Sequence, residues 1–224
     1  MNDNIKLVKK AILATLIYAD LFDFPLKKKE IWRRLIWRLS RRGRVRPARK
    51  NFEENLKNFD FENNFYFLPG RQKIVGIRRG REVESVKKLR IAKQVAKILK
   101  IIPLIRLVGL SGSVAAGNAK KDDDIDFFII TKAGWLWTTR FLTTFLLSLL
   151  RIRRRPGEKS FRDKICLNMF LDESHLDIFS QNQDLFIAHE ICQLKSLWQR
   201  GNTYQKFLSA NLWIKDFLPN AKPS

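Results

Sequence analysis

Two apolar stretches near the middle of the chain, joined by a polar segment, constrain the fold more than any other feature. Residues 104–110 read Leu-Ile-Arg-Leu-Val-Gly-Leu and residues 125–131 read Ile-Asp-Phe-Phe-Ile-Ile-Thr. Short apolar runs of this kind, bounded by turn and polar residues, are typical of β-strands. We therefore expect two strands, with a Gly-Ser turn after the first and a group of acids leading into the second.

The acids at the start of the second strand are spaced for metal binding. Side chains alternate faces along a strand, so Asp124 and Asp126 project to one side with Cα atoms roughly 6.5 to 7 Å apart. Neighbouring carboxylates repel each other, and Mg²⁺ prefers one or two carboxylates plus the phosphates of a substrate. Asp124 and Asp126 are therefore candidate ligands for Mg²⁺ or Mn²⁺. The alternative is a solvated acidic loop at 122–124, with Asp126 an ordinary strand-end residue.

The turn after the first strand has the composition of a phosphate-binding turn. Gly112 leaves the backbone free to bend and Ser113 adds a hydroxyl donor, and ten residues separate Ser113 from Asp124. A P-loop is excluded, because Gly117 is followed by Asn-Ala instead of a lysine and a hydroxyl residue. A dinucleotide-binding fingerprint is also excluded, because the sequence G-x-G-x-x-G does not occur. Lys120 and Lys121 either help to neutralise phosphate or lie in a solvated loop.

This order of strand, Gly-Ser turn, spacer and Asp-Ile-Asp strand resembles the signature of the DNA polymerase beta superfamily of nucleotidyltransferases. The resemblance implies an α/β (α+β) nucleotidyltransferase fold, with a small mixed sheet flanked by helices. It also implies that Gly112 and Ser113 bind the phosphates of an NTP, with ATP the first choice. Asp124 and Asp126 would hold the metal ions that promote transfer of an NMP to a hydroxyl acceptor, which the sequence does not identify.

The resemblance is incomplete at a third position. Many members of the superfamily carry a third carboxylate on the next strand, expected here over residues 164–171. Alternation places Cys166, Asn168 and Phe170 on one face of that strand, with no acid among them. Asn168 is the candidate for this catalytic position, unless Asp163 or Asp172 reaches the site from a strand end. An amide cannot take the proton from an acceptor hydroxyl as a carboxylate does, so an asparagine there would leave the transferase slow or inactive. The alternative function is therefore a nucleic-acid-binding regulator with a nucleotide-sensing or inactive transferase-like domain.

The first 70 residues predict a small helical domain. Apolar spacing indicates helices over 4–18, over 28–39 and from Pro47 onward. An aromatic-rich hairpin at 59–68, turning at Asn63-Asn64, follows them. Three helices and a two-stranded hairpin resemble a winged-helix domain. We expect a winged-helix-like domain over 1–70, a basic connecting helix over 71–101 and the nucleotidyltransferase domain over 102–224.

The charge balance predicts an anionic partner. Lys and Arg number 44 against 22 acids, giving a net charge of +22. Part of this charge lies in the N-terminal domain, where nucleic acid is the partner we expect, although a solvated basic surface is the alternative. The candidate nucleic-acid contacts are Arg33, Arg34, Arg41, Arg42, Arg44, Arg46, Arg49 and Lys50.

Other features point to a cytoplasmic protein. Cys166 and Cys192 form no C-x-x-C pair and suggest buried thiols in a reducing compartment. The apolar segment 135–150 is too short to span a membrane, and we expect a buried or partly amphipathic helix there in preference to one on a membrane surface. The arginines at 151–155 match either the negative end of that helix dipole or a clamp on phosphate. Apolar stripes over 187–198 and 203–217 predict two further helices.

Overall fold

The computed structural model describes residues 2–37, 48–158 and 160–222. The chain divides into two compact units. The N-terminal unit runs to Gly80 and also contains Gln183–Cys192 and Trp213–Lys222, while the sheet unit contains Arg81–Asn182 and Gln193–Leu212. Each unit has its own apolar core.

The N-terminal unit forms its elements in the predicted order. Helices α1 (Asn2–Asp20), α2 (Lys28–Arg33) and α3 (Arg49–Leu56) precede a hairpin of β1 (Phe61–Glu62) and β2 (Phe65–Tyr66). The hairpin turns at two asparagines with φ of 52° and 70°, a conformation that asparagine tolerates. The winged-helix assignment stays a prediction. The second helix ends earlier than its apolar spacing suggested, because the N–H of Ile36 donates to the Thr15 hydroxyl at 3.0 Å and not to a helical carbonyl.

A buried arginine stabilises this unit. Arg78 has a 3% exposed side chain and forms a two-pronged ion pair with Glu30, at 2.7 and 2.8 Å. Its guanidinium also donates to the carbonyl of Pro25 and lies 4.0 Å from the ring centre of Phe24 and 4.7 Å from that of Phe65. Removing one partner of such a pair leaves an uncompensated buried charge.

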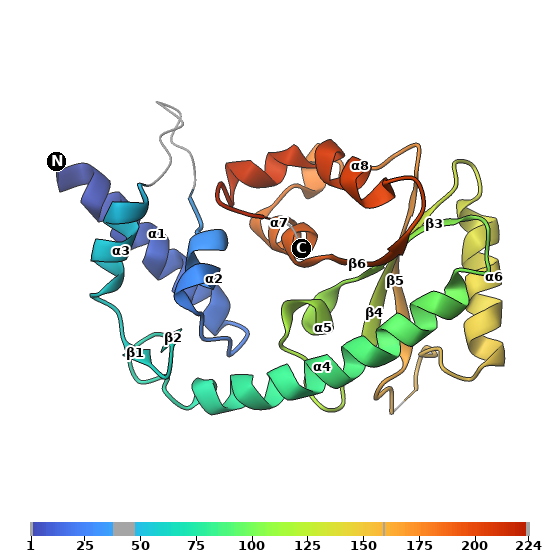
Figure 1. The fold of residues 1–224 in the computed structure, drawn as a ribbon, viewed down its shortest axis with the longest axis horizontal. Coiled ribbons are helices and arrows are strands. Elements are labelled where there is room, and N and C mark those ends of the chain that lie inside the picture. Colours follow the sequence, from blue (N-terminus) through green and yellow to red (C-terminus); the bar gives the residue numbers. More distant parts are fainter. Residues whose placement is uncertain (1, 38–47, 159, 223–224) are drawn as a thin grey trace. The chain divides into compact units, whose positions relative to one another are not determined.

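The sheet unit is built on four strands in the order β5-β4-β3-β6 (Figure 1). These strands are β3 (Ile105–Leu110), β4 (Ile125–Thr131), β5 (Ile165–Asp172) and β6 (Lys195–Gln199). Strand β3 is antiparallel to β4 and β6, whereas β4 and β5 are parallel. The sheet is therefore mixed, as the resemblance to the nucleotidyltransferases implied. The remaining elements are α4 (Ile74–Leu99), α5 (Gly112–Ala116), α6 (Leu136–Leu149), α7 (Leu185–Gln193), α8 (Thr203–Ala210) and two short 3-10 helices, Ser180–Asn182 and Leu212–Asp216.

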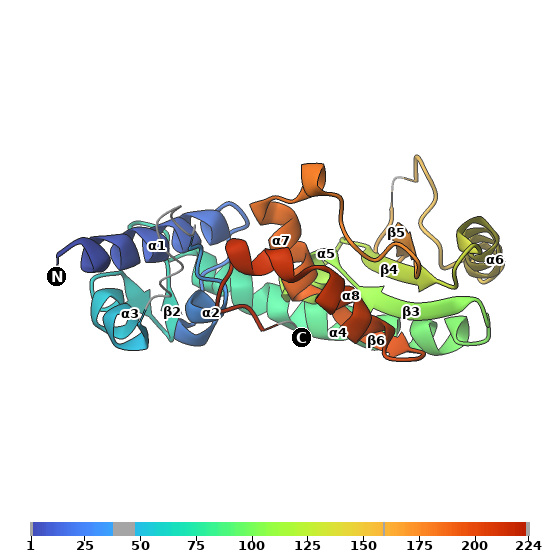
Figure 2. The same cartoon turned by 90° about the horizontal axis from the view of Figure 1, so that it is seen from above.

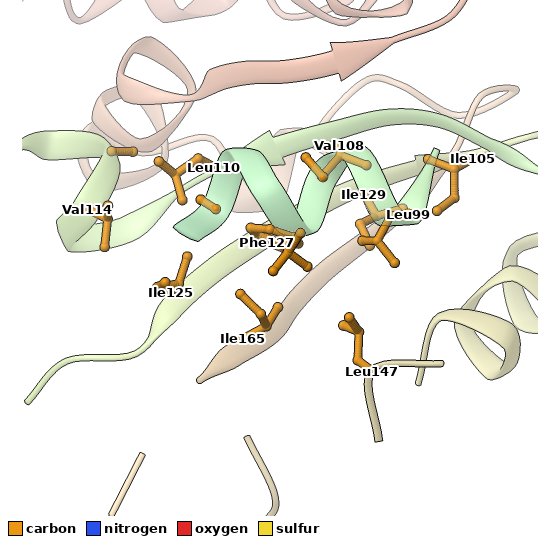
Figure 3. Packing of buried hydrophobic residues seen from close by; sticks show 14 of the residues in the cluster. Leu99, Ile105, Val108, Leu110, Val114, Ile125, Phe127, Ile129, Leu147 and Ile165 are labelled. Carbon is orange, nitrogen blue, oxygen red and sulfur yellow. The ribbon is translucent and has the colours of Figure 1, made fainter. Parts of the chain in front are cut away.

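Helices cover both faces of the sheet. On one face, Phe127 and Ile129 of β4 pack in a core with Leu99 of α4 and Leu147 of α6 (Figure 3). On the other face, the ring of Phe128 lies 5.1 Å from that of Phe207 in α8. Asp126 shares this second face by alternation, so its carboxylate projects away from the core formed with α4 and α6, here called the α4 core.

The predicted helix over 187–198 is wrong in its second half. Helix α7 ends at Gln193, and the chain continues as β6 along β3, with Trp198 opposite Val108. Leu194 packs closely on Gly109, where an added Cβ would lie 3.1 Å from its Cδ1. Backbone pairing with a strand some 90 residues earlier thus decides the conformation of a segment whose apolar spacing suggested a helix.

Within the described ranges, no helix combines the length and the apolar character that crossing a bilayer requires.

Candidate active site

The two aspartates meet a cysteine at the start of β4. Asp124 directly precedes the strand, Asp126 is its second residue, and Cys166 of β5 pairs with Asp126 in register. One carboxylate oxygen from each aspartate and the cysteine sulfur all lie within 4.8 Å of one another. Asp124 is buried, and the other two are half-buried. The structure therefore brings the predicted metal-binding pair together on one face of the sheet.

Gly112 provides the space that the Asp126 carboxylate occupies. Its φ is +64°, and a Cβ added there would lie 3.2 Å from Asp126 Cγ and closer still to Oδ2. The adjacent Ser111 N–H donates to the Asp126 carbonyl at 3.0 Å, which holds the turn against β4. A side chain at position 112 would collide with the carboxylate, so glycine is required for both conformation and space.

Ser113 organises the loop that leads to the aspartates. Its hydroxyl donates to Asp123 Oδ2 at 2.9 Å, and the Lys120 N–H donates to the same oxygen at 2.9 Å. The side chains of Lys120 and Lys121 are exposed. Phosphate binding by Gly112, Ser113, Lys120 and Lys121 stays a prediction, and for Ser113 it requires the hydroxyl to exchange its bond with Asp123.

A buried lysine, which sequence reasoning missed, anchors this loop from α4. Lys88 is 0% exposed, and its ammonium donates to the carbonyls of Lys121 and Asp123 at 3.0 and 2.7 Å. The third bond, at 2.7 Å, goes to Asp163 Oδ1. This ion pair engages Asp163, one of the acids considered for the third catalytic position. A lysine in a basic helix gives no sequence signal that distinguishes it from its exposed neighbours.

Arg154 forms an ion pair with Asp124. Its Nη1 lies 2.7 Å from Asp124 Oδ2, and its guanidinium lies 4.4 Å from the ring centre of Phe161. The hydrogen bond and the charge of Asp124 raise the pKa of Arg154 above its ordinary value. Arg154, one of the arginines at 151–155, therefore contacts the site. The sequence alone did not decide whether these arginines balance the helix dipole or bind phosphate.

Asn168 does not face the aspartates as alternation suggested. The β4–β5 register shifts between the pairs Phe127–Leu167 and Phe128–Met169, so Asn168 lies at a bulge and is exposed. Beyond the bulge the faces are exchanged, and Phe170 joins the α4 core. The expected common face of Cys166, Asn168 and Phe170 is therefore wrong, because one extra residue inverts the alternation.

Cys166 occupies the place beside the aspartates that the sequence assigned to Asn168. Burial, followed by the charges of Asp126 and Asp124, raises the pKa of Cys166 to about 12. The thiol is therefore neutral at physiological pH. Alternation had placed Cys166 on this face, but a lone cysteine gave no signal for a role among carboxylates.

Asp172 lies at the other end of the sheet from the aspartate pair. It pairs with Thr131, five residues along β4 from Asp126, a span of about 16 Å. Its carboxylate accepts bonds from the backbone N–H groups of Ser174 and Gly134. Asp172 therefore caps the turn after β5 and does not supply the third carboxylate.

The basic candidates in the N-terminal unit have different environments. Arg41, Arg42, Arg44 and Arg46 lie outside the described residues. Arg33 and Lys50 are exposed, Arg49 pairs with Glu53 at 3.4 Å, and the half-buried Arg34 stacks over Phe24 at 5.2 Å. Nucleic-acid binding by this group stays a prediction.

Comparisons with known proteins match part of this chain to a family model. Residues 91–166 match the family model described as Nucleotidyltransferase domain. Among solved structures, a mutant of the MntA–HpeT toxin–antitoxin is 16% identical, with 53% of this chain and 81% of that chain covered and a TM-score of 0.32. A toxin–antitoxin with AMP-PNP is 19% identical, with 57% and 84% covered and a TM-score of 0.28. A search of curated proteins gave no match.

The matched segment contains the parts from which the site is built. It runs from the end of α4 through the glycine turn and both aspartates and stops at Cys166. The four-stranded mixed sheet with helices on both faces agrees with the fold that the sequence resemblance implied. Residues 91–166 therefore match a nucleotidyltransferase domain, in agreement with the resemblance that the Gly-Ser turn and the aspartate pair indicated.

Proposed function

We propose that the chain transfers an NMP from an NTP, with ATP the first choice, to a hydroxyl acceptor, using Mg²⁺ or Mn²⁺ held by Asp124 and Asp126. The observation that carries the proposal is the convergence of the two carboxylates beside the turn at Gly112. Carboxylate oxygens are the ligands these cations prefer, and the side-chain-free position at Gly112 leaves Asp126 room to present them.

The residues around the aspartates have separate roles in the proposal. Gly112 and Ser113 bind the terminal phosphates of the NTP, with Lys120 and Lys121 adding positive charge. A bound divalent cation supplies charge neutralisation and polarisation at the phosphate under attack. Arg154 balances the charge of Asp124 before nucleotide arrives, so binding of a cation at Asp124 competes with this ion pair.

Proton removal from the acceptor is the weakest step of this chemistry. Among the described His, Cys, Asp and Glu residues, the group around the aspartates contains no third acid, and its third member is the neutral thiol of Cys166. A neutral thiol and an amide are both poor bases. This observation favours a second candidate function, a nucleotide-sensing regulator that binds nucleic acid through its basic N-terminal unit.

Calorimetric titration tests the binding part of the proposal. We expect MgATP to bind the wild type and to lose most of its affinity for a variant carrying both Asp124→Asn and Asp126→Asn. Equal binding to both proteins would refute the site assignment. A variant carrying Asp177→Asn and Asp216→Asn, which changes two exposed carboxylates outside the site, controls for the loss of two negative charges.

Label transfer separates the two candidate functions. The protein is incubated with each α-labelled nucleotide, Mg²⁺ or Mn²⁺ and a cell extract, and the labelled fraction is identified. Transfer that depends on both aspartates supports the enzyme. Absence of transfer, together with a salt-dependent shift of duplex DNA that persists in the double variant, supports the regulator.

A further inference from the structure

Helix α6 presents aromatic and aliphatic side chains to solvent along one face. Trp137, Phe141, Phe145 and Leu149 follow one another at intervals of four residues, and they are 77%, 68%, 60% and 67% exposed. Residues four apart lie on one side of a helix, so these four form a continuous stripe, here called the α6 stripe. Contiguous exposed apolar surface of this kind marks an interaction site more often than isolated exposed residues do.

The opposite face of α6 explains why the stripe points outward. Thr139, Thr143 and Leu147 are each 0% exposed. The two threonine hydroxyls donate to carbonyls one turn earlier in the same helix, each at 2.7 Å, so their burial leaves no donor unsatisfied. The small threonines let α6 approach the sheet beside β5 (Figures 1 and 2), while the larger apolar side chains remain in solvent.

The charges within the segment that contains α6 are of one sign, and the carboxylates of Asp172 and Glu173 lie beside the turn that precedes the helix. Residues 132–157 contain six Lys or Arg and no Asp or Glu. Arg140 is exposed and lies 6.0 Å from the ring centre of Trp137 and 5.3 Å from that of Phe170. Arg151 and Arg155, just beyond the C-terminal end of α6, are also exposed. The partner of this surface must therefore combine apolar area with negative charge.

We propose that the α6 stripe and its flanking arginines bind the surface of an anionic lipid bilayer, with α6 lying in the plane of the interface. Interfacial helices combine Trp, Phe and Leu on one side with Lys and Arg around them. At 14 residues, α6 is about 21 Å long and cannot cross a hydrocarbon core of about 30 Å. A second copy of the chain fits less well, because two such faces would bring the exposed Arg140, Arg151 and Arg155 of both copies together, and residues 132–157 supply no acid to offset them.

Vesicle flotation of the full-length protein tests this proposal. Vesicles of phosphatidylcholine containing about 30 mol% phosphatidylglycerol supply the negative surface potential, and vesicles of phosphatidylcholine alone are the neutral comparison. We expect binding to the anionic vesicles, weakened by salt, and little binding to the neutral ones. Failure of the wild type to float with anionic vesicles overturns the proposal.

Matched variants separate the α6 stripe from general basicity. A variant with Phe141→Ser and Phe145→Ser loses two exposed rings, and we expect its affinity for the anionic vesicles to fall on the order of a hundredfold. The control is Phe179→Ser, which removes a ring that is 64% exposed elsewhere in the sheet unit and should leave vesicle binding unchanged. Equal binding by the double variant and the wild type means that charge alone acts, and the proposal is then wrong.

Two further measurements complete the test. Unchanged MgATP binding by the double variant, measured against the wild type, supports the proposal by showing that a loss of vesicle binding does not come from unfolding. Light scattering of the lipid-free protein detects self-association. If the wild type does not bind vesicles but forms a dimer that the double substitution abolishes, the α6 stripe binds a second copy of the chain. That result overturns the proposal.

Discussion

Replacing Gly112 with alanine should weaken both the folded state and metal-nucleotide binding. Position 112 has a φ of +64°, and a non-glycine residue in this conformation costs about 1–2 kcal/mol. The added methyl group would also lie 3.2 Å from Asp126 Cγ and closer to Oδ2, forcing the carboxylate from its rotamer at a cost of about 0.5–1.5 kcal/mol. We therefore expect a loss of about 1.5–3.5 kcal/mol in the free energy of unfolding.

Gly117→Ala is the matched control for this substitution. Gly117 lies at the other end of α5 with a φ of +77°, but a Cβ there would meet no atom within 4 Å. It should therefore lose only the conformational part, about 1–2 kcal/mol. Both values come from urea unfolding of the two variants beside the wild type, and the difference between the variants measures the contact with Asp126.

Nucleotide binding gives the sharper comparison. A displaced metal ligand should lower the MgATP affinity of Gly112→Ala by about 10- to 100-fold, the range seen when support of a metal ligand is lost. Gly117→Ala should bind MgATP as the wild type does. If calorimetry finds the same affinity for both variants, Asp126 does not hold the metal in the orientation seen here, and the reasoning is refuted.

Three other substitutions test electrostatic features. Arg154→Gln should raise the affinity of the nucleotide-free protein for Mn²⁺ by about three- to tenfold, because it releases a carboxylate oxygen from an ion pair; Arg155→Gln, with the same change of charge, should have a smaller effect in the same titration. Arg78→Ala should lower the free energy of unfolding by about 3–5 kcal/mol, because its carboxylate partner remains unpaired, whereas the exposed Arg79→Ala should change it by less than about 0.5 kcal/mol in urea unfolding. Burial and then a nearby arginine lower the pKa of His189 from 6.5 to about 3, so the unfolded chain binds a proton at this residue before the folded chain does. The free energy of unfolding should therefore decline by up to about 1.4 kcal/mol per pH unit as the pH falls below 6.5. Urea unfolding between pH 7 and 5 should show a shallower decline for His189→Gln, and an equal slope in both proteins would contradict this assignment.

Local sequence patterns predicted the strands of the site but not all of their neighbours. The runs at 104–110 and 125–131 became β3 and β4, and the spacing of Asp124 and Asp126 placed both carboxylates on one face. These features depend on periodicity within a single strand, which the sequence contains. Strand β6 was missed because its conformation depends on pairing with β3, an interaction between distant segments.

The third position of the site shows a different limit. Counting alternate residues along β5 identifies Cys166 and Asn168 together, but the bulge between Leu167 and Met169 leaves only Cys166 beside the aspartates. Bulges arise from the register between two strands and leave no mark in the apolar pattern of one. The ion pair of Arg154 with Asp124 is similar, because it brings together residues 30 positions apart.

The environment of Lys88 has a consequence for the chemical reactivity of the chain. An ammonium group has three hydrogens, and those of Lys88 have three oxygen acceptors, in the two loop carbonyls and Asp163. Its nitrogen should therefore resist acetic anhydride under conditions that modify the exposed lysines of the same helix, such as Lys93 and Lys97. Mass spectrometry of this one amine then reports when the loop before the aspartates opens, and a shift in its protection on addition of nucleotide would reveal that movement without any mutation.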